Sequence, residues 1–238
     1  MREYELYLPS ISQLNDPFEG AIPFVYDQAE LTPENIFLKL YSMSKKEHPD
    51  WDDSKIHEHV FNEYKRGTLF DDKHLENNIK NTRDDIERNF GVLSLTTQKN
   101  NFLMWSHYAE SHKGICIGFD TEILSNTIGG VLGAAIYQRE LPKFSMIQET
   151  MEFMAKLLFT KSDVWIYEDE YRITKFNAAR KTYKLPKNAI KEVILGMSMP
   201  HTLKNELISI ITEKLPDISV FDTSLNKSTF DIDLLQIR

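Results

Sequence analysis

Cysteine is almost missing from this chain, with Cys116 as the one example among 238 residues. A single thiol cannot form an intramolecular disulfide, which excludes a disulfide-stapled scaffold and is typical of a reducing compartment. Cys116 lies in a predicted apolar strand and has no basic neighbour in the sequence. We therefore expect it to pack in the core and not to act as a nucleophile.

Long hydrophobic runs are missing as well. No apolar stretch approaches the length needed to cross a bilayer, and residues 1–5 lack the apolar segment of a signal peptide. The sequence also shows no repeat, no low-complexity tract and no linker. These absences predict a cytoplasmic protein with no membrane contact.

Basic residues are outnumbered, with 28 Lys and Arg against 36 Asp and Glu, which gives a net charge of −8. This charge makes general nucleic-acid binding unfavourable, because phosphates would be repelled. Residues 171–191 are the exception, since they contain no acidic residue and seven basic ones: Arg172, Lys175, Arg180, Lys181, Lys184, Lys187 and Lys191. Two interpretations stay open: a solvated hairpin loop, or a segment that guides a phosphate-rich ligand, nucleic acid included.

Hydrophobic residues make up 41% of the chain, which is enough for a sizeable core. Segregated strand-like and helix-like segments predict an α+β fold, as a single domain over residues 1–238, with a largely antiparallel sheet and helices packed around it. We expect a helical insertion at about residues 31–90. In it, Thr32 caps a helix and Pro33 takes the first helical position. The sequence makes no prediction of the oligomeric state.

Apolar periodicity predicts the individual elements. The predicted strands cover residues 4–8, 91–96, 115–119, 131–138, 167–176 and 190–195, and two further strands close the chain. The predicted helices cover residues 54–66, 71–89, 148–161 and 203–215. Another helix contains Trp105 and is expected to end at Gly114 as a left-handed cap. The strand at residues 115–119 is expected to be central in the sheet.

The first of three motifs is Asn15-Asp16-Pro17-Phe18-Glu19. An Asn-Asp pair before proline can cap backbone amides and hold a rigid loop near a site, and Phe18 is expected to anchor this loop in the core. Asn15 and Asp16 are candidate ligand-binding residues. Asp16 and Glu19 are expected to position other groups rather than perform chemistry. The same pattern also fits a purely structural turn.

The second motif places Trp105, His107 and Tyr108 on one helix, followed by His112. With 3.6 residues per turn, Trp105, Tyr108 and His112 share one side, and His107 faces the opposite one. The two histidines are five residues apart and do not converge, so no metal site is predicted. Trp105, His107 and Tyr108 are candidate ligand-binding residues, and a histidine here also fits a hydrogen-bonded structural role.

The third motif is Trp165 followed by Glu168, Glu170 and Arg172. On a strand, the last three side chains point to the same side. They fit either a solvated surface or a cleft in which the arginine keeps one carboxylate ionised while the pKa of the other is raised. The flanking aromatic residues indicate a sheltered position, and Trp165 and Arg172 are candidate ligand-binding residues.

Together, these motifs resemble a bacterial family, the domain of unknown function numbered 2971. The resemblance rests on residues 15–19, on Ser94 in a strand, on residues 104–109 with Gly114 downstream, and on residues 165–172. It extends over nearly the whole chain. Members of the family usually begin with an additional strand and helix, and we expect this chain to be short at its N-terminus by that element. Either the start codon is misplaced or this member has lost its first element.

A second resemblance is to mono-ADP-ribosyltransferases of the arginine–serine–glutamate type. Residues 168–170 resemble their Glu-x-Glu motif and residues 94–96 resemble their serine-bearing strand, whereas their first-strand arginine has no counterpart. The resemblance implies that Glu170 and Glu168 are the catalytic residues. Glu170 would stabilise the positive charge that develops as nicotinamide leaves NAD, and Glu168 would position it.

The same resemblance implies roles for the ligand-binding residues. Ser94 would donate a hydrogen bond on the ribose side of the ligand. Trp105 or Tyr108 would stack on a ring, and Arg172 or the basic segment would hold a pyrophosphate.

Two functions from different classes stay open. The first is an ADP-ribosyltransferase-like enzyme, a toxin or phage-defence effector, that acts on NAD as co-substrate or on another nucleotide-type ligand. The second is a non-catalytic regulatory module that binds a small nucleotide-type ligand or a partner in the same cleft. A hydrolase with Glu168 and Glu170 as acid and base is disfavoured, because carboxylates that flank a scissile bond usually come from different elements.

Overall fold

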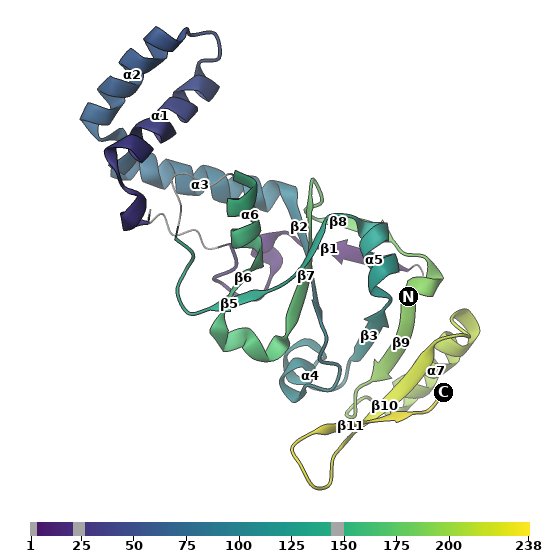
Figure 1. The fold of residues 1–238 in the computed structure, drawn as a ribbon. Coiled ribbons are helices and arrows are strands. Elements are labelled where there is room, and N and C mark those ends of the chain that lie inside the picture. The colour runs from purple at the N-terminus through teal and green to yellow at the C-terminus, as the bar shows by residue number, and fades with distance from the viewer. Residues whose placement is uncertain (1–3, 21–26, 144–149) are drawn as a thin grey trace.

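The structure is a computed structural model that describes residues 4–20, 27–143 and 150–238 (Figure 1). The predicted α+β class is confirmed, with helices packed around mostly antiparallel strands. The strands are β1 Glu5–Leu8, β2 Phe90–Thr96, β3 Ile115–Phe119, β4 Val131–Ala134, β5 Ile136–Gln138, β6 Thr160–Ser162, β7 Glu170–Phe176, β8 Lys181–Lys184, β9 Ile190–Leu195, β10 Ser219–Leu225 and β11 Ile232–Gln236.

Helices occupy most of the chain between the strands. The α-helices are α1 Pro33–Glu47, α2 Asp53–Arg66, α3 Asp72–Asn89, α4 Phe102–Tyr108, α5 Thr121–Ile128, α6 Thr150–Phe159 and α7 His201–Lys214. Short 3₁₀ helices are η1 Ile11–Gln13, η2 Gln28–Glu30, η3 Thr68–Phe70, η4 Asp163–Glu168 and η5 Lys187–Ala189. Within the described ranges, none of the helices combines the length and the apolar character that a membrane span requires.

Helices α1 and α2 form a hairpin that stands at one end of the molecule and is joined to the sheets by α3 (Figure 1). The Thr32 hydroxyl accepts a hydrogen bond from the Asn35 amide, Pro33 occupies the first turn, and Gly67 ends α2 in the left-handed conformation. The hairpin has its own apolar cluster around Leu40, Ile56, Val60 and Leu69. Its stability therefore depends mainly on contacts between neighbouring helices.

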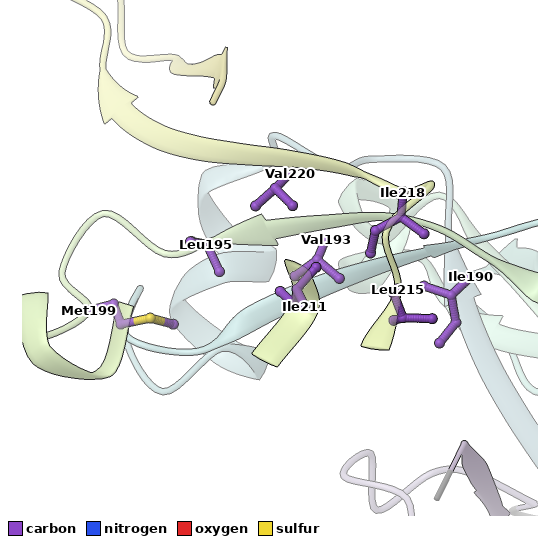
Figure 2. Close-up of a cluster of buried hydrophobic side chains, with 8 residues drawn as sticks. All are labelled: Ile190, Val193, Leu195, Met199, Ile211, Leu215, Ile218 and Val220. Carbon is purple, nitrogen blue, oxygen red and sulfur yellow. The ribbon is translucent and has the colours of Figure 1, made fainter. Parts of the chain in front are cut away.

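The described strands form four sheets, with the orders β1-β8, β11-β10-β9-β3, β2-β7-β4 and β5-β6. Strand β9 is buried in the four-stranded sheet, and α7 covers one face of it (Figure 2). Their contact is made by a buried apolar cluster that consists of Ile190, Val193, Leu195, Met199, Ile211, Leu215, Ile218 and Val220. Removing these side chains from water is the main stabilising contribution in this half of the molecule.

The three-stranded sheet brings polar residues of two motifs next to each other. Antiparallel pairing of β2 with β7 sets Ser94 opposite Arg172 and Thr96 opposite Glu170. Because side chains directly opposite each other in a sheet lie on the same face, the serine-bearing strand and the Glu-x-Glu region come together. This register links two motifs that are about 75 residues apart in the sequence.

Several predicted elements need correction. Residues 115–119 form an edge strand rather than a central one, because β3 pairs with β9 alone in the described sheet order. Residues 131–138 split into β4 and β5, which belong to different sheets. The predicted helix at residues 148–161 is α6, which ends at Phe159 before the short strand β6; its predicted start at residues 148–149 lies outside the described residues.

The predicted left-handed cap at Gly114 is also wrong. Helix α4 already ends at Tyr108, and the left-handed residues are Glu110, Ser111 and His112. The loop then folds back, so that the Gly114 amide donates to the carbonyl of Ala109 at 2.8 Å. A Cβ atom at Gly114 would lie only 3.0 Å from the Ala109 Cα. Glycine is therefore required here because the two backbone segments approach closely, and not because of a left-handed φ angle.

Candidate functional site

Arg172 on β7 is the centre of a buried network of charges, with a side chain that is only 1% exposed. Its Nη1 atom donates to Glu19 Oε2 at 2.9 Å, and its Nη2 atom bonds the other oxygen of the same carboxylate. Its Nε atom donates to Glu170 Oε1 at 2.9 Å and Nη2 donates to Glu170 Oε2 at 3.0 Å. A planar guanidinium is suited to hold two carboxylates in this paired geometry.

Lys161 on β6 extends the network. Its ammonium donates to Glu168 Oε2 at 2.5 Å and to Glu170 Oε2 at 2.9 Å, and it lies 5.2 Å from the ring centroid of Trp165. Glu168 and Glu170 are each 3% exposed and Lys161 is 6% exposed. Within this network, buried cations and anions alternate from Glu19 through Arg172, Glu170 and Lys161 to Glu168. This pairing offsets the cost of removing the charges from water.

Tyr108 joins the network to the Asn-Asp-Pro loop. Its hydroxyl donates to Glu168 Oε1 at 2.5 Å and accepts a hydrogen bond from Asn15 Nδ2 at 2.9 Å. Three segments that are far apart in the sequence therefore meet at one phenolic oxygen. The tyrosine side chain is half exposed, so it forms the boundary between the buried charges and solvent.

The prediction that Glu168, Glu170 and Arg172 share one strand is wrong for Glu168. Strand β7 begins at Glu170, whereas Glu168 ends the 3₁₀ helix η4 and Asp169 adopts a left-handed conformation with φ of 46°. The Asp169 carboxylate is bonded by the hydroxyl of Thr97 and, at 3.2 Å, by the side-chain amide of Gln98. These bonds hold the unusual turn, and the two glutamates meet through Lys161 instead of through strand alternation.

A cavity of about 400 Å³ lies against this network. We call it the acidic chamber, because three carboxylates and a single ammonium line it. Its charged and polar lining consists of Gln13, Asn15, Glu19, Ser94, Thr96, Tyr108, Lys161, Glu168 and Glu170. Leu14, Leu95 and Met104 supply apolar surface. A chamber with convergent polar groups and some apolar wall is typical of a small-molecule site.

Burial and pairing move the pKa values of these groups in different directions. Burial raises the pKa of Glu19 above its usual value, although Arg172 opposes this shift. Burial also acts on Glu170, but the hydrogen bonds and charge of Arg172 outweigh it and lower the pKa of Glu170. The hydrogen bonds from Lys161 to Glu168 and Glu170 outweigh its burial and raise the pKa of Lys161. Burial and the bond to Glu168 raise the pKa of Tyr108.

One of the two alternatives left open by the sequence was a cleft in which Arg172 keeps one of Glu168 and Glu170 ionised while the pKa of the other is raised. Glu170 and Glu168 are buried and not on a solvated surface, and Glu170 is the carboxylate whose pKa is lowered. The carboxylate with the raised pKa is Glu19, which comes from the Asn-Asp-Pro-Phe-Glu loop. Glu19 had been expected only to position other groups, and its ion pair with Arg172 could not be read from a separation of 153 residues.

Trp105 does not reach the acidic chamber. Its side chain is 3% exposed and packs in a separate cluster with Ala109, Ile194 and Ile232, while its indole N–H donates to the carbonyl of Lys99 at 3.0 Å. The prediction that Trp105 stacks on a ligand is therefore wrong, and Trp105 is a core residue. Because α4 ends early, His112 is not on the helix at all; its Nε2 lies 3.0 Å from Ser106 Oγ.

His107, Trp165 and Tyr167 form an aromatic group outside the acidic chamber. The His107 ring lies 6.4 Å from the Trp165 ring and 6.2 Å from the Tyr167 ring, measured between centroids. Trp165 contacts the network through the ammonium of Lys161. Of the predicted ligand-binding residues, Asn15, Ser94 and Tyr108 line the chamber, whereas Arg172 lies behind the carboxylates.

Phe18 is 63% exposed, so the prediction that it anchors the loop in the core is wrong. The loop is held instead by polar contacts. Asp16, which is buried, accepts a hydrogen bond from the Phe18 amide at 2.9 Å, and Glu19 binds Arg172. Asp16 and Phe18 both line a second cavity, of about 280 Å³, which shares Glu19 and Lys161 with the acidic chamber.

Lys161 was missed by the sequence reasoning, although it contacts both glutamates. It lies at the end of a predicted amphipathic helix, where a lysine is usually solvated. The basic segment at residues 171–191 divides: Arg172 is buried in the network, whereas Arg180 pairs with Glu87 and Lys191 with Asp120. Strand β8 within this segment pairs with β1, so the segment is not a simple hairpin loop.

No group of His, Cys, Asp and Glu side chains suited to a metal ion is found among the described residues. Cys116 is partly buried, and burial raises the pKa of its thiol, which makes the thiolate scarce at neutral pH. The polar groups that line the acidic chamber are carboxylates, hydroxyls, side-chain amides and the ammonium of Lys161.

Comparison with known proteins gives a match to a family model over part of the chain and no function. Residues 104–173 match the sequence model of a family described as a protein of unknown function, DUF2971. This confirms the resemblance predicted from the motifs. The match includes the Trp105 and Trp165–Arg172 motifs, and residues 15–19 and Ser94 lie outside it. Neither the curated proteins nor the solved structures contain a significant match to the chain.

Proposed function

We propose that the acidic chamber binds the ribosyl part of a nucleotide-type ligand, and that the buried ion network holds the recognising carboxylates in place. The observation that carries the proposal is the convergence of Glu168, Glu170 and Ser94 on one cavity of about 400 Å³. Carboxylates are strong acceptors for the vicinal hydroxyls of a ribose, and a serine hydroxyl can donate or accept.

The carboxylates have capacity for such a ligand. Glu168 accepts one bond at each oxygen, from Tyr108 and from Lys161. An ionised carboxylate has about four acceptor positions, so ligand hydroxyls can bind without breaking these bonds. A phosphate fits the same chamber poorly, since three carboxylates against one ammonium would repel it. The ribose is therefore the part of the ligand that enters.

The lowered pKa of Glu170 supports a second candidate, the transfer or hydrolysis of the ribosyl group of NAD. Glu170 stays ionised, as a carboxylate that stabilises a developing ribosyl cation must. Its charge is shared with Lys161 and Arg172, however, both within hydrogen-bonding distance. Neutralisation by these two cations weakens the stabilisation that Glu170 can give to a ribosyl cation. We therefore prefer binding to catalysis as the function of the chamber.

Calorimetric titration of the wild-type chain with NAD and ADP-ribose tests the binding proposal. We expect Ser94→Ala to weaken binding by roughly two- to tenfold, the value of one neutral hydrogen bond. Ser94 is exposed, but its side chain also hydrogen-bonds Glu170, so the melting temperature of the variant is measured beside its affinity. Ser224→Ala, on the exposed part of β10, is the matched control and should bind like wild type. Equal binding by wild type and Ser94→Ala, or no binding at all, would contradict the proposal.

Chromatography of nicotinamide separates the two candidates. A binding module leaves NAD intact over long incubation, whereas a transferase or glycohydrolase releases nicotinamide. Because Glu170 is buried between two cations, Glu170→Gln is expected to destabilise the fold, so loss of activity in that variant alone would prove little. The test therefore compares wild type and Ser94→Ala at equal folded fraction.

A further inference from the structure

Strand β11 lies at one edge of the four-stranded sheet, in the hairpin that extends from the molecule at the end opposite helices α1 and α2 (Figure 1). Among the described strands it pairs with β10 alone, so its other side is an open edge. We propose that a second copy of this chain adds its own β11 to this edge in antiparallel orientation, which joins the two sheets across a twofold axis. The inference does not depend on the proposed function, because β11 contributes nothing to the acidic chamber.

The backbone of β11 presents hydrogen-bonding groups at the open edge. The Asn226 amide donates to the carbonyl of Asp231 at 3.0 Å, and the Ile237 amide donates to the carbonyl of Val220 at 2.9 Å, so residues 231 and 237 direct their backbone groups toward β10. Because these directions alternate along an antiparallel strand, the amides and carbonyls of residues 232, 234 and 236 face the open edge. A row of such groups is a template for an added strand.

The sequence of β11 does not protect this edge. Natural edge strands are commonly protected by lysine, proline or a bulge. Strand β11 contains neither lysine nor proline, its one charged residue is Asp233, and its pairing with β10 is regular from Ile232 to Gln236. At the opposite edge of the same sheet, the five residues of β3 are all partly buried. The accessible edge of this sheet is therefore β11.

Apolar side chains next to this edge are exposed on the face of the sheet that α7 covers. Leu235 lies opposite Asp222, whose carboxylate accepts a bond from Lys204 of α7 at 2.7 Å, so Leu235 is on the α7 face. Ile237, two residues further along, is on the same face. Their side chains are 65% and 41% exposed, which shows that α7 leaves the β11 side of this face uncovered. An added strand with apolar residues on this face would shield both side chains from water.

A second copy of β11 fits the edge because the strand is complementary to itself. In a twofold antiparallel pair, directly opposite residues lie on the same face of the sheet. Registers that place Asp233 opposite its own copy or opposite Asp231 bring like charges together and are unfavourable. With Leu235 opposite its own copy, the acids lie on opposite sides of the axis and two exposed leucines meet. In this register Leu234 and Gln236 face each other, and their edge-facing backbone groups form the hydrogen bonds.

Sedimentation equilibrium tests the association. We expect wild type to reach twice the chain mass of 27.8 kDa with increasing concentration and to dissociate on dilution. Leu235→Lys replaces an apolar pair by two like charges at the axis and should raise the dissociation constant by about tenfold or more. Leu225→Lys is the matched control, because Leu225 is 63% exposed and lies on β10, outside the paired edge. This variant should associate like wild type.

Gln236→Pro tests the backbone bonds separately from the side chains. Proline removes the amide that faces the open edge and leaves the bonds between β10 and the odd-numbered residues of β11 in place. We expect the dissociation constant to rise by about tenfold or more, since the bonds that this amide donates across the axis are lost. Gln236→Ala keeps the amide and should associate like wild type. Circular dichroism of both variants shows whether the fold is retained.

Leu235→Cys tests the register. Opposite residues of a non-hydrogen-bonded antiparallel pair have Cα atoms about 4.5 Å apart, which a disulfide can span. On mild oxidation we expect a covalent dimer of Leu235→Cys, whereas Leu225→Cys and wild type, whose Cys116 is partly buried, should run as monomers on a non-reducing gel. A wild type that stays monomeric at every concentration overturns the inference. So does a dimer that neither Leu235→Lys nor Gln236→Pro weakens, or one that Leu235→Cys does not cross-link.

Discussion

The side-chain amide of Asn15 and the carboxylate of Glu168 bind the same atom, the hydroxyl oxygen of Tyr108, at 2.9 and 2.5 Å. This relationship connects the Asn-Asp-Pro loop, helix α4 and the end of η4 at the surface of the acidic chamber. The loop and the glutamate are 153 residues apart in the sequence, so the contact depends entirely on the tertiary fold.

Tyr108→Phe tests this connection. The change removes the hydroxyl that Glu168 and Asn15 share, and we expect the free energy of unfolding to fall by about 1.5–3 kcal/mol, as for a hydrogen bond to a charged group. Urea denaturation followed by circular dichroism measures the loss. Tyr171→Phe, in strand β7, is the control and should change stability little. An equal effect of the two substitutions would show that the Tyr108 hydroxyl does not contribute.

Lys161→Met should be among the most damaging substitutions in the chain. It leaves Glu168 and Glu170 without the ammonium that both contact, and we expect a loss of about 3–5 kcal/mol in the free energy of unfolding. That loss is a large share of the stability of a typical domain, so a molten or insoluble product is also in line with the prediction. Lys45→Met breaks only an exposed pair with Asp53 and should have almost no effect. A melting temperature for Lys161→Met close to that of wild type would contradict the structural role given to this lysine.

The raised pKa of Glu19 predicts a defined pH dependence. Because the folded protein holds the Glu19 proton more tightly than the unfolded chain, the stabilisation is fully present below the ordinary value of 4.5 and is lost as the pH rises through the higher folded pKa. Glu19→Gln imitates the protonated form at every pH. The stability of wild type relative to Glu19→Gln should therefore decrease as the pH rises above 4.5.

Urea titrations of both proteins at several pH values measure this difference, with Glu206→Gln on the exposed face of α7 as control. At the acid end the stability of each protein, unlike the difference between the two, should fall as the pH falls. Glu170, whose pKa is lowered, contributes stability above 4.5 that is lost as the pH falls through its folded pKa, in wild type and in Glu19→Gln alike. A relative stability that does not vary with pH would refute the assignment to Glu19.

Trp105→Phe tests whether Trp105 stabilises the core and does not bind a ligand. Because the indole is buried in the core and donates to the carbonyl of Lys99, we expect a loss of about 1–3 kcal/mol from the smaller ring and the missing hydrogen bond. Ligand affinity, measured by calorimetry at a temperature where the variant is folded, should remain that of wild type. Weakened binding without a loss of stability would show that Trp105 contributes to ligand binding and not to the core.

Local sequence signals predicted most of the helices and strands of this protein, although helix α5 was missed. Thr32 and Pro33 start α1, Gly67 ends α2, and the alternation at residues 91–96 marks β2, because caps, glycines and apolar periods act over a few neighbouring residues. The same signals indicated Glu168, Glu170 and Arg172 as a candidate site, since acids and a guanidinium flanked by aromatic residues are unusual. The family resemblance followed from these short motifs too.

Only the tertiary structure decided which residues share that site. It brought in Lys161 and Glu19, placed Trp105 in the core, and left Phe18 exposed beside a cavity. These outcomes depend on contacts between segments that lie up to 153 residues apart, for which a local pattern carries no information. Desolvation and long-range pairing set the charge state and partner of each buried group, and both exist only once the chain has folded.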